Sequence, residues 1–318
     1  MLLSNMHILI TGGTGLVGSA LLATVPIDQE YIQCTSLGST QADLRDYTTS
    51  YEYIKHLHTH SPIDAIFHCA AKVGGLYRNI NEPVDMINDN VLINTNILTI
   101  AHRLNIDKVV CVLSTFIFPD NTQYPIKPSS LHDGPPHSSN EGYAYAKRLL
   151  EVQCRAYQKQ FKRMYFCIVP TNVYGPNDNF HPTDSHVIPA LIRKAVIASR
   201  TDQVLKVLGD GEQYRQFIYS HDLASIMWWA MFNYANYSIP LVCCPGKEVQ
   251  IKQVVETIAR YLNLQIEYVT AETGQARKTC MSTNDQLQSQ GYAQQFAFKE
   301  LEEGLTDTIE WYKKSLLG

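Results

Sequence analysis

The chain has 318 residues, 45% of them hydrophobic, which is enough for one large α/β domain with a smaller lobe. The formal net charge is −4 and the charges are interspersed, which argues against nucleic acid and an anionic membrane as partners. The eight cysteines show no paired spacing, so we predict neither a disulfide framework nor a metal site. With no signal peptide and no membrane-length apolar run evident, we expect a cytoplasmic protein.

A glycine-rich turn opens the chain, between a short apolar strand at residues 7–11 and a helical stretch from about residue 19. Its glycines recur every third residue, at positions 12, 15 and 18. A strand, a tight turn and a helix N-terminus together bring free N–H groups close to a pyrophosphate, so this order predicts dinucleotide binding. The residues of the turn that we expect at the cofactor are Gly12, Thr14, Gly15, Leu16 and Val17.

The second strand is predicted at residues 31–35. The residues at its C-terminal end distinguish an NAD site from an NADP site. A carboxylate there would bind the ribose 2′-hydroxyl and indicate NAD. Cys34, Thr35 and Ser36 carry no such charge, which leaves room for a 2′-phosphate and favours NADP(H), although no arginine stands there either. Further along, Asp43 and Leu44 could flank the adenine, and a solvated turn explains them equally well.

Two later strands lead toward the same region. Residues 65–71 read as a buried strand that meets the cofactor with two small residues, Ala70 and Ala71. An amphipathic helix is predicted over residues 85–104, followed by a strand at 109–114 with Ser114 at its C-terminal end. Ligands of open α/β sheets bind at that edge, so Ser114 can hold a substrate oxygen, or it merely caps a turn.

Tyr143 and Lys147 lie four residues apart in a helix predicted to run to about residue 161, so they share one face. An ammonium near a phenol lowers the pKa of that phenol, which suits a proton donor to a ketone that hydride reduces. The spacing alone is weak evidence, since Tyr51 and Lys55 repeat it.

A strand is predicted at residues 166–169, and from Pro170 onward polar loops rich in Asn, His and Pro become frequent. The alternation of strands and helices up to this point predicts an α/β fold with a Rossmann-type doubly wound parallel sheet. We therefore expect an NADP-binding domain at residues 1–170. Residues 171–318 should form mainly a smaller C-terminal substrate lobe, with helices near 187–198, 223–233 and 250–261 and with some segments returning to the first domain.

The glycine turn, Ser114, Tyr143 and Lys147 follow one another in the order typical of extended short-chain dehydrogenases/reductases, which the chain resembles. Residues 170–193 and 70–75 look more narrowly like GDP-L-fucose synthase, and the resemblance runs essentially from end to end. That family epimerises C3 and C5 of GDP-4-keto-6-deoxymannose and then reduces C4 with NADPH. The resemblance implies a GDP-linked keto sugar as substrate and a homodimer packed through helices 85–104 and 143–161, although packing within one subunit also explains their apolar faces.

Roles carry over residue by residue. Ser114, Tyr143 and Lys147 match the reductase triad, and His186 matches the acid or base of epimerisation, unless it only caps the next helix. Arg215 matches a position near the nucleotide diphosphate, and its fork of donors suits phosphate. The resemblance places further cofactor contacts at Pro170, Asn172 and Val173. It places substrate contacts at Lys72, Val73, Gly74, Asn172, Val187 and Leu208, the last in place of a tryptophan, with Lys194 and Lys278 as lesser candidates or plain surface cations.

One departure concerns the epimerase chemistry. The family places a cysteine two residues after Ser114, and this chain has Phe116, whose ring carries no proton. Loss of a positioned acid or base costs roughly 10²–10⁴-fold in rate, so we predict a C4-ketoreductase with little or no epimerisation. The alternatives are a full GDP-L-fucose synthase that recruits Tyr124 or water, a non-catalytic dinucleotide sensor, and an epimerase like the UDP-galactose enzyme.

Overall fold

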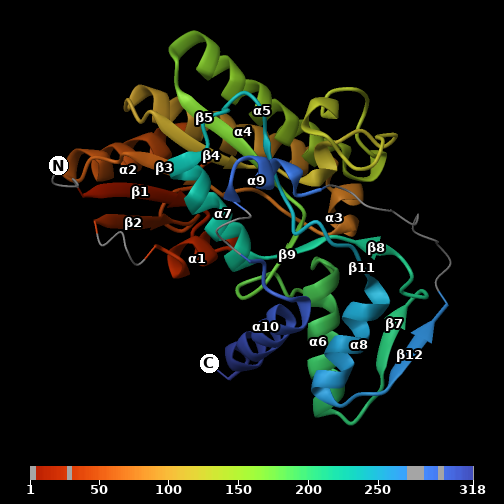
Figure 1. The fold of residues 1–318 in the computed structure, drawn as a ribbon. Coiled ribbons are helices and arrows are strands. Elements are labelled where there is room, and N and C mark those ends of the chain that lie inside the picture. The colour runs from red at the N-terminus through yellow and green to blue at the C-terminus, as the bar shows by residue number, and fades with distance from the viewer. Residues whose placement is uncertain (1–4, 27–30, 271–282, 293–296, 318) are drawn as a thin grey trace.

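The computed structural model describes residues 5–26, 31–270, 283–292 and 297–317. Its centre is a six-stranded sheet in the order β10-β5-β4-β3-β1-β2, in which every neighbouring pair is parallel (Figure 1). The α/β architecture with a Rossmann-like parallel sheet is therefore confirmed. The strands of this sheet are β1 (Met6–Thr11), β2 (Ile32–Leu37), β3 (Ala65–His68), β4 (Lys108–Val112), β5 (Met164–Pro170) and β10 (Leu241–Cys243).

Alternate side chains of the strands enter two separate cores, one on each face of the sheet. In β1, Ile8 and Ile10 pack into one core, while Leu9 packs into the other. A period of two with both faces buried is what a parallel sheet covered by helices requires. The helices are α1 (Leu16–Ala23) and α7 (Ser220–Asn233) on one face, and α2 (Tyr47–His60), α4 (Pro83–Arg103) and α5 (Glu141–Phe161) on the other.

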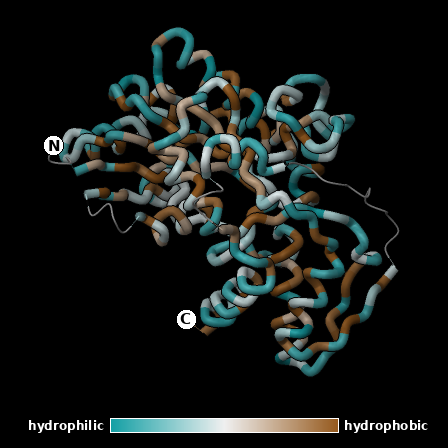
Figure 2. Tube along the Cα trace, viewed as in Figure 1, coloured by the Kyte–Doolittle hydropathy of each residue, from teal (hydrophilic) through white to brown (hydrophobic). Residues whose placement is uncertain are grey.

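A third apolar core lies in a smaller lobe, at the lower right of Figure 1. Figure 2 shows apolar residues gathered inside this lobe and along the central strands. The lobe contains α6 (Val187–Arg200), α8 (Ile251–Leu262) and α10 (Leu301–Ser315), with β7 (Leu205–Leu208) paired to β12 (Ile266–Val269). Smaller pairs are β6 (Asn172–Tyr174) with β9 (Phe217–Tyr219), and β8 (Tyr214–Arg215) with β11 (Val249–Gln250).

Two segments of the C-terminal half belong to the central sheet. β10 pairs with β5, and α7 packs beside α1. A third C-terminal segment, α9 (Asp285–Ser289), packs against β10, with Leu287 in the same core as α1 and α7. The remaining short helices are α3 (Leu76–Asn81), before α4, and η1 (Thr115–Ile117), η2 (Pro128–Ser130) and η3 (Ser138–Asn140), between β4 and α5.

Three strand ends differ from the prediction by two residues or more, and each difference moves a loop at the ligand edge. β2 continues beyond residue 35 to Leu37, because Leu37 pairs with Thr11 and is buried. β3 ends at His68 and β4 at Val112. Ser114 therefore follows its strand in a loop, as the two alanines after β3 do.

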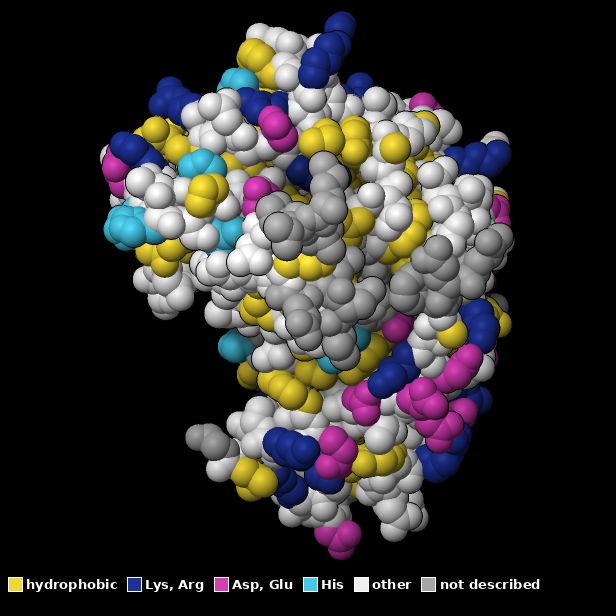
Figure 3. Space-filling model, turned by 60° about the vertical axis from the view of Figure 1, so that its left-hand side comes forward, with side chains coloured by type: hydrophobic (Ala, Val, Ile, Leu, Met, Phe, Trp, Pro, Cys, Tyr) yellow, Lys and Arg dark blue, Asp and Glu magenta, His cyan; other side chains and the backbone are white. Residues whose placement is uncertain are grey.

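No helix in the described ranges is both long and apolar enough to cross a bilayer. The described cysteines are all free thiols. Among the described residues there is no cluster of His, Cys, Asp and Glu suited to a metal ion. On the face shown in Figure 3, acidic and basic side chains are interspersed.

Candidate active site

A cleft of about 1180 Å³ lies between the sheet domain and the smaller lobe. The loops after β1, β2, β3 and β4 form one wall, and the loop before α6 together with β8 forms the other. The cleft exceeds the ~300–1,000 Å³ of usual small-molecule pockets, so it has room for a dinucleotide and a nucleotide sugar together.

The glycine turn has the close packing that a pyrophosphate site needs. Gly12 has a φ of +67°, and a Cβ there would lie 2.7 Å from the backbone nitrogen of Ala70. A Cβ at Gly18 would lie 2.3 Å from the carbonyl oxygen of Gly12. Both positions therefore need glycine, and α1 begins at Leu16 with its N-terminus toward the cleft. These residues fit a dinucleotide.

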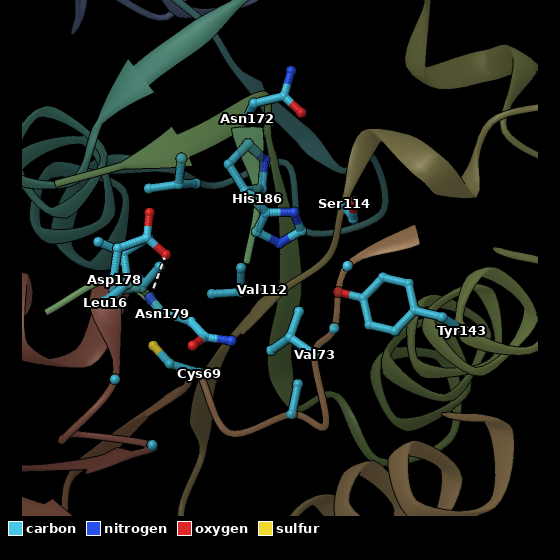
Figure 4. A pocket seen from close by; sticks show the side chains of 18 of the residues that line it. Leu16, Cys69, Val73, Val112, Ser114, Tyr143, Asn172, Asp178, Asn179 and His186 are labelled. Atoms are coloured by element: carbon cyan, nitrogen blue, oxygen red, sulfur yellow. Dashed lines mark hydrogen bonds between the residues drawn. The ribbon is translucent and has the colours of Figure 1, made fainter. Parts of the chain in front are cut away.

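Most of the predicted site residues meet in this cleft. They are Gly12, Thr14, Gly15, Leu16, Val17, Asp43, Leu44, Ala70, Ala71, Val73, Gly74, Ser114, Tyr143, Lys147, Pro170, Asn172, Val173, His186, Val187 and Arg215. Figure 4 shows Tyr143, Ser114, His186 and Asn172 around the same space.

Three predicted substrate contacts do not line the cleft. The Nζ of Lys72 lies 3.0 Å from a carboxylate oxygen of Asp89 and 3.3 Å from one of Asp85, so its ammonium forms ion pairs with two acids of α4. Lys194 is exposed on α6, and Leu208 is exposed at the end of β7. Lys278 falls outside the described residues.

Tyr143 and Lys147 are both buried on one face of α5. The Nζ of Lys147 lies 5.9 Å from the centre of the Tyr143 ring and donates a hydrogen bond of 2.8 Å to the carbonyl oxygen of Val112. β4 therefore fixes the ammonium beside the phenol, and in Figure 4 the Tyr143 hydroxyl points into the cleft.

The expected lowering of the Tyr143 pKa is wrong for this structure. Burial raises the pKa of Tyr143, because a phenolate away from water is unfavourable. Burial also lowers the pKa of Lys147 to about 8. At neutral pH the phenol is therefore fully protonated, as a proton donor must be.

Ser114 both caps a turn and faces the cleft. Its Oγ accepts a hydrogen bond of 3.3 Å from the backbone N–H of Phe116, at the start of η1. This bond leaves the hydroxyl proton available to a ligand oxygen. Phe116 itself lines the cleft with 40% of its surface exposed, so at this position the wall carries an aromatic ring and no titratable group.

His186 stands at the N-cap position of α6, yet its side chain makes no capping hydrogen bond. Its predicted alternative role as a cap is therefore wrong. The ring lines the cleft, whose walls lower the pKa of His186 by burial, with Asp184 partly opposing the effect. At neutral pH the imidazole is uncharged and can accept a proton.

The loop before α6 adds two acids that sequence reasoning missed. One carboxylate oxygen of Asp178 is buried without a hydrogen-bond partner, and burial raises the pKa of this group to about 7. Asp184 accepts hydrogen bonds of 2.9 Å from the backbone N–H of Gly75 and from Arg78. The signal available in the sequence was only two acids in a polar loop that also carries His186.

Comparison with known proteins agrees with this geometry. The sequence profile described as "NAD dependent epimerase/dehydratase family" matches residues 8–241. A probable GDP-L-fucose synthase of Drosophila melanogaster is 40% identical over 321 residues, which cover 96% of each chain. The GDP-L-fucose synthase of Dictyostelium discoideum is 38% identical over 316 residues, covering 97% of this chain and 96% of that one.

A solved structure shares the fold over the whole chain. The GDP-L-fucose synthetase from Naegleria fowleri bound to NADP superposes with a TM-score of 0.89 and 34% identity, covering 100% of this chain and 95% of the other. The chain therefore belongs to the NAD dependent epimerase/dehydratase family and, within it, to the GDP-L-fucose synthase family, as its motifs predict.

Proposed function

We propose that this protein is an NADPH-dependent C4-ketoreductase of a GDP-linked 4-keto sugar, a 6-deoxyhexose or a heptose, with little or no epimerisation at C3 and C5. The observation that supports the reductase is the grouping of Ser114, Tyr143 and Lys147 at one end of a cleft built for a dinucleotide. The observation that argues against efficient epimerisation is the ring of Phe116 in the same wall.

The chain's own groups act on the keto oxygen. Ser114 donates its hydroxyl proton in a hydrogen bond to that oxygen, and Tyr143 delivers its proton there as the alkoxide forms. Lys147, while charged, stabilises the phenolate that remains. When bound, NADPH supplies the hydride to C4.

Each of the two walls of the cleft would bind a different ligand. Residues 1–170 would hold the cofactor, through the glycine turn and the loops after β2 and β3, and residues 171–318 would hold mainly the GDP-sugar. Arg215 lines the second wall and is the group we assign to the diphosphate. The NADP in the related Naegleria structure supports NADP(H) as the cofactor. A cytoplasmic location stays a prediction from the sequence.

A complete 3,5-epimerase plus 4-reductase is the second candidate, because His186 lines the cleft and the similar proteins carry the name GDP-L-fucose synthase. Inversion at a ring carbon needs a base on one face and an acid on the other. Tyr124 lies beside Phe116 in a small side cavity and is not among the described residues that line the main cleft. Burial raises the pKa of Tyr124, so its phenol stays protonated and cannot serve as the base.

The test is reduction of GDP-4-keto-6-deoxymannose with NADPH in deuterated water, followed by NMR of the product. We expect C4 to be reduced while C3 and C5 keep their protons. Efficient deuterium incorporation at both carbons would contradict the reductase-only proposal. NADPH oxidation that continues unchanged in the Tyr143→Phe variant would contradict the catalytic assignment itself.

A further inference from the structure

We infer that this chain binds NADPH and NADH with similar affinity, because hydroxyl groups beside β2 stand where dedicated basic or acidic side chains select between the two coenzymes. The inference rests on the proposed function, in which the cleft holds a nicotinamide dinucleotide. It concerns the corner of the cleft formed by Thr14, Gly38 and Ser39.

This corner is assembled from the turns after β1 and β2. The side chain of Thr14 lies against Gly38, where an added Cβ would be 3.5 Å from Thr14 Oγ1. Gln41 holds the second turn closed by accepting a hydrogen bond of 2.9 Å from the N–H of Gly38. Residues at the end of the second strand face the adenosine ribose when a dinucleotide lies on such a glycine turn. Ser39 therefore lies at the 2′ position.

No cation is free to favour the 2′-phosphate here. Arg45 is the sole lysine or arginine among residues 31–46, and its guanidinium pairs with Asp43 at 2.6 Å and with Asp89 at 3.1 Å. Within the described residues that line the cleft, Lys147 and Arg215 are the lysine and arginine present. Lys147 belongs to the catalytic face of α5, and Arg215 comes from the smaller lobe.

No acid is free to favour the ribose diol either. Residues 31–42 contain neither Asp nor Glu. Asp43 lines the cleft, but its hydrogen bonds with Arg45 lower its pKa and balance its charge. The corner therefore lacks both the repulsion that excludes NADPH and the carboxylate that selects NADH.

Hydroxyl groups serve both ligands. The side-chain oxygens of Thr14 and Ser39 make no hydrogen bond with other residues in the described ranges, and both side chains are exposed to the cleft. A hydroxyl donates to a phosphate oxygen, and it equally accepts from or donates to a ribose hydroxyl. A guanidinium fork would instead favour the dianionic phosphate, and a carboxylate would favour the diol.

The experiment measures coenzyme affinity directly, by fluorescence titration of the full chain with NADPH and with NADH in the absence of any sugar. We expect the two dissociation constants to agree within about tenfold, which is one step of ~1.4 kcal/mol. A preference for NADPH of about a thousandfold would overturn the inference, and so would an equally strong preference for NADH.

Two variants locate the selecting position. Ser39→Arg should tighten NADPH binding by about tenfold or more, in a salt-dependent way, and leave NADH binding unchanged. Ser39→Asp should weaken NADPH binding by a similar factor and spare NADH. Gln33→Arg is the matched control, because Gln33 is exposed on β2 outside the cleft. Unchanged NADPH affinity in Ser39→Asp would place the 2′ group elsewhere and overturn the assignment.

A pair of fragments separates this inference from the proposed function. 2′,5′-ADP and ADP differ only in the 2′-phosphate, and we expect them to compete with NADPH about equally well. Strong selection between these fragments would contradict the inference alone. Failure of both intact coenzymes to bind would contradict the proposed function.

Discussion

Lys147 is the residue whose ionisation sets the upper pH limit of the proposed reaction. Burial lowers the pKa of Lys147 to about 8, so its ammonium is charged below that pH and neutral above it. We expect kcat/KM for keto-sugar reduction to fall as the pH rises through about 8, because the phenolate then loses its stabilising charge. Initial rates of NADPH oxidation between pH 6 and pH 10 measure this.

The Lys147→Arg variant is the control for that profile. A guanidinium stays charged to beyond pH 12, so the fall near pH 8 should disappear even if the rate is lower throughout. A wild-type profile that stays flat to pH 10 would contradict the role given to Lys147.

Phe116 is the second residue whose substitution tests the proposed function. Replacing it with cysteine restores a titratable group to the wall of the cleft that also contains His186. We expect Phe116→Cys to raise solvent-deuterium exchange at C3 and C5 of the sugar by roughly 10²-fold or more over the wild type. The measurement is NMR of the product formed in deuterated water.

Phe116→Ser is the matched control, because serine has nearly the size of cysteine but no acidic thiol. It should open the same space without raising the exchange. Equal exchange in the two variants would show that space at position 116, rather than a proton donor, had limited the wild type.

The positions of single candidate catalytic residues were predictable where the local sequence determines them. Tyr143 and Lys147 share a helix face, and Ser114 follows a strand. The α/β fold class is therefore nearly enough to predict that the three side chains lie close together. The direction of the Tyr143 pKa was not predictable, because burial depends on the packing of the whole domain. The unpaired oxygen of Asp178 was missed for the same reason.

At the scale of elements, the loop after β3 and the loop before α6 are tied together across the cleft. Both oxygens of Asp184 are used: one accepts a hydrogen bond from the N–H of Gly75, and the other pairs with Arg78 of α3. The two loops carry Val73 on one side and His186 on the other, and both line the cleft. Asp184 therefore links these two walls of the cleft.

We expect Asp184→Ala to raise KM for the GDP-sugar several-fold while the dissociation constant of NADPH stays unchanged. Asp184→Asn keeps an acceptor for the N–H of Gly75 but loses the ionic bond to Arg78, so its KM should lie between the other two. Steady-state kinetics and fluorescence titration give the two values. A fall in thermal stability with KM unaltered would show that the tie is only structural.

The sequence analysis did not predict α2 or α10. The other long helices and the buried strands up to residue 170 were predicted to within a few residues, because one face or both faces of each are apolar. The shortest elements were not. β6, β8, β9 and β11 have three or fewer residues each, and their pairing comes from neighbours some forty residues away in the chain. β2 extends beyond its predicted end at residue 35 for a similar reason, because its residues up to Leu37 pair with β1.

For the whole molecule, the sequence predicted a second lobe with some segments returning to the first domain, but it did not identify those segments. α7 is apolar nearly all round, as a helix buried against α1 must be, and that composition alone suits either lobe. The pairing of β10 with β5 and the packing of α7 in the same core as α1 place this part of the chain on the sheet.

The outer surface of the paired helices α4 and α5 bears on assembly. Tyr145, Leu149 and Val152 follow one another at spacings of four and three along α5, so they share a face. Each is about 40% exposed, and Leu92 on the neighbouring α4 is 45% exposed. An apolar stripe on two adjacent helices suits packing against the same stripe of a second copy about a two-fold axis.

We therefore expect a homodimer in solution, with twice the 36.0 kDa mass of one chain by light scattering. The double variant Leu149→Glu and Val152→Glu should shift the mass to that of the monomer, because four charges would face one another across the two-fold axis. Leu316→Glu is the control, since Leu316 is equally apolar and 44% exposed but lies at the C-terminal end of α10. A wild-type mass of one chain, or a double variant that stays dimeric, would contradict this interface.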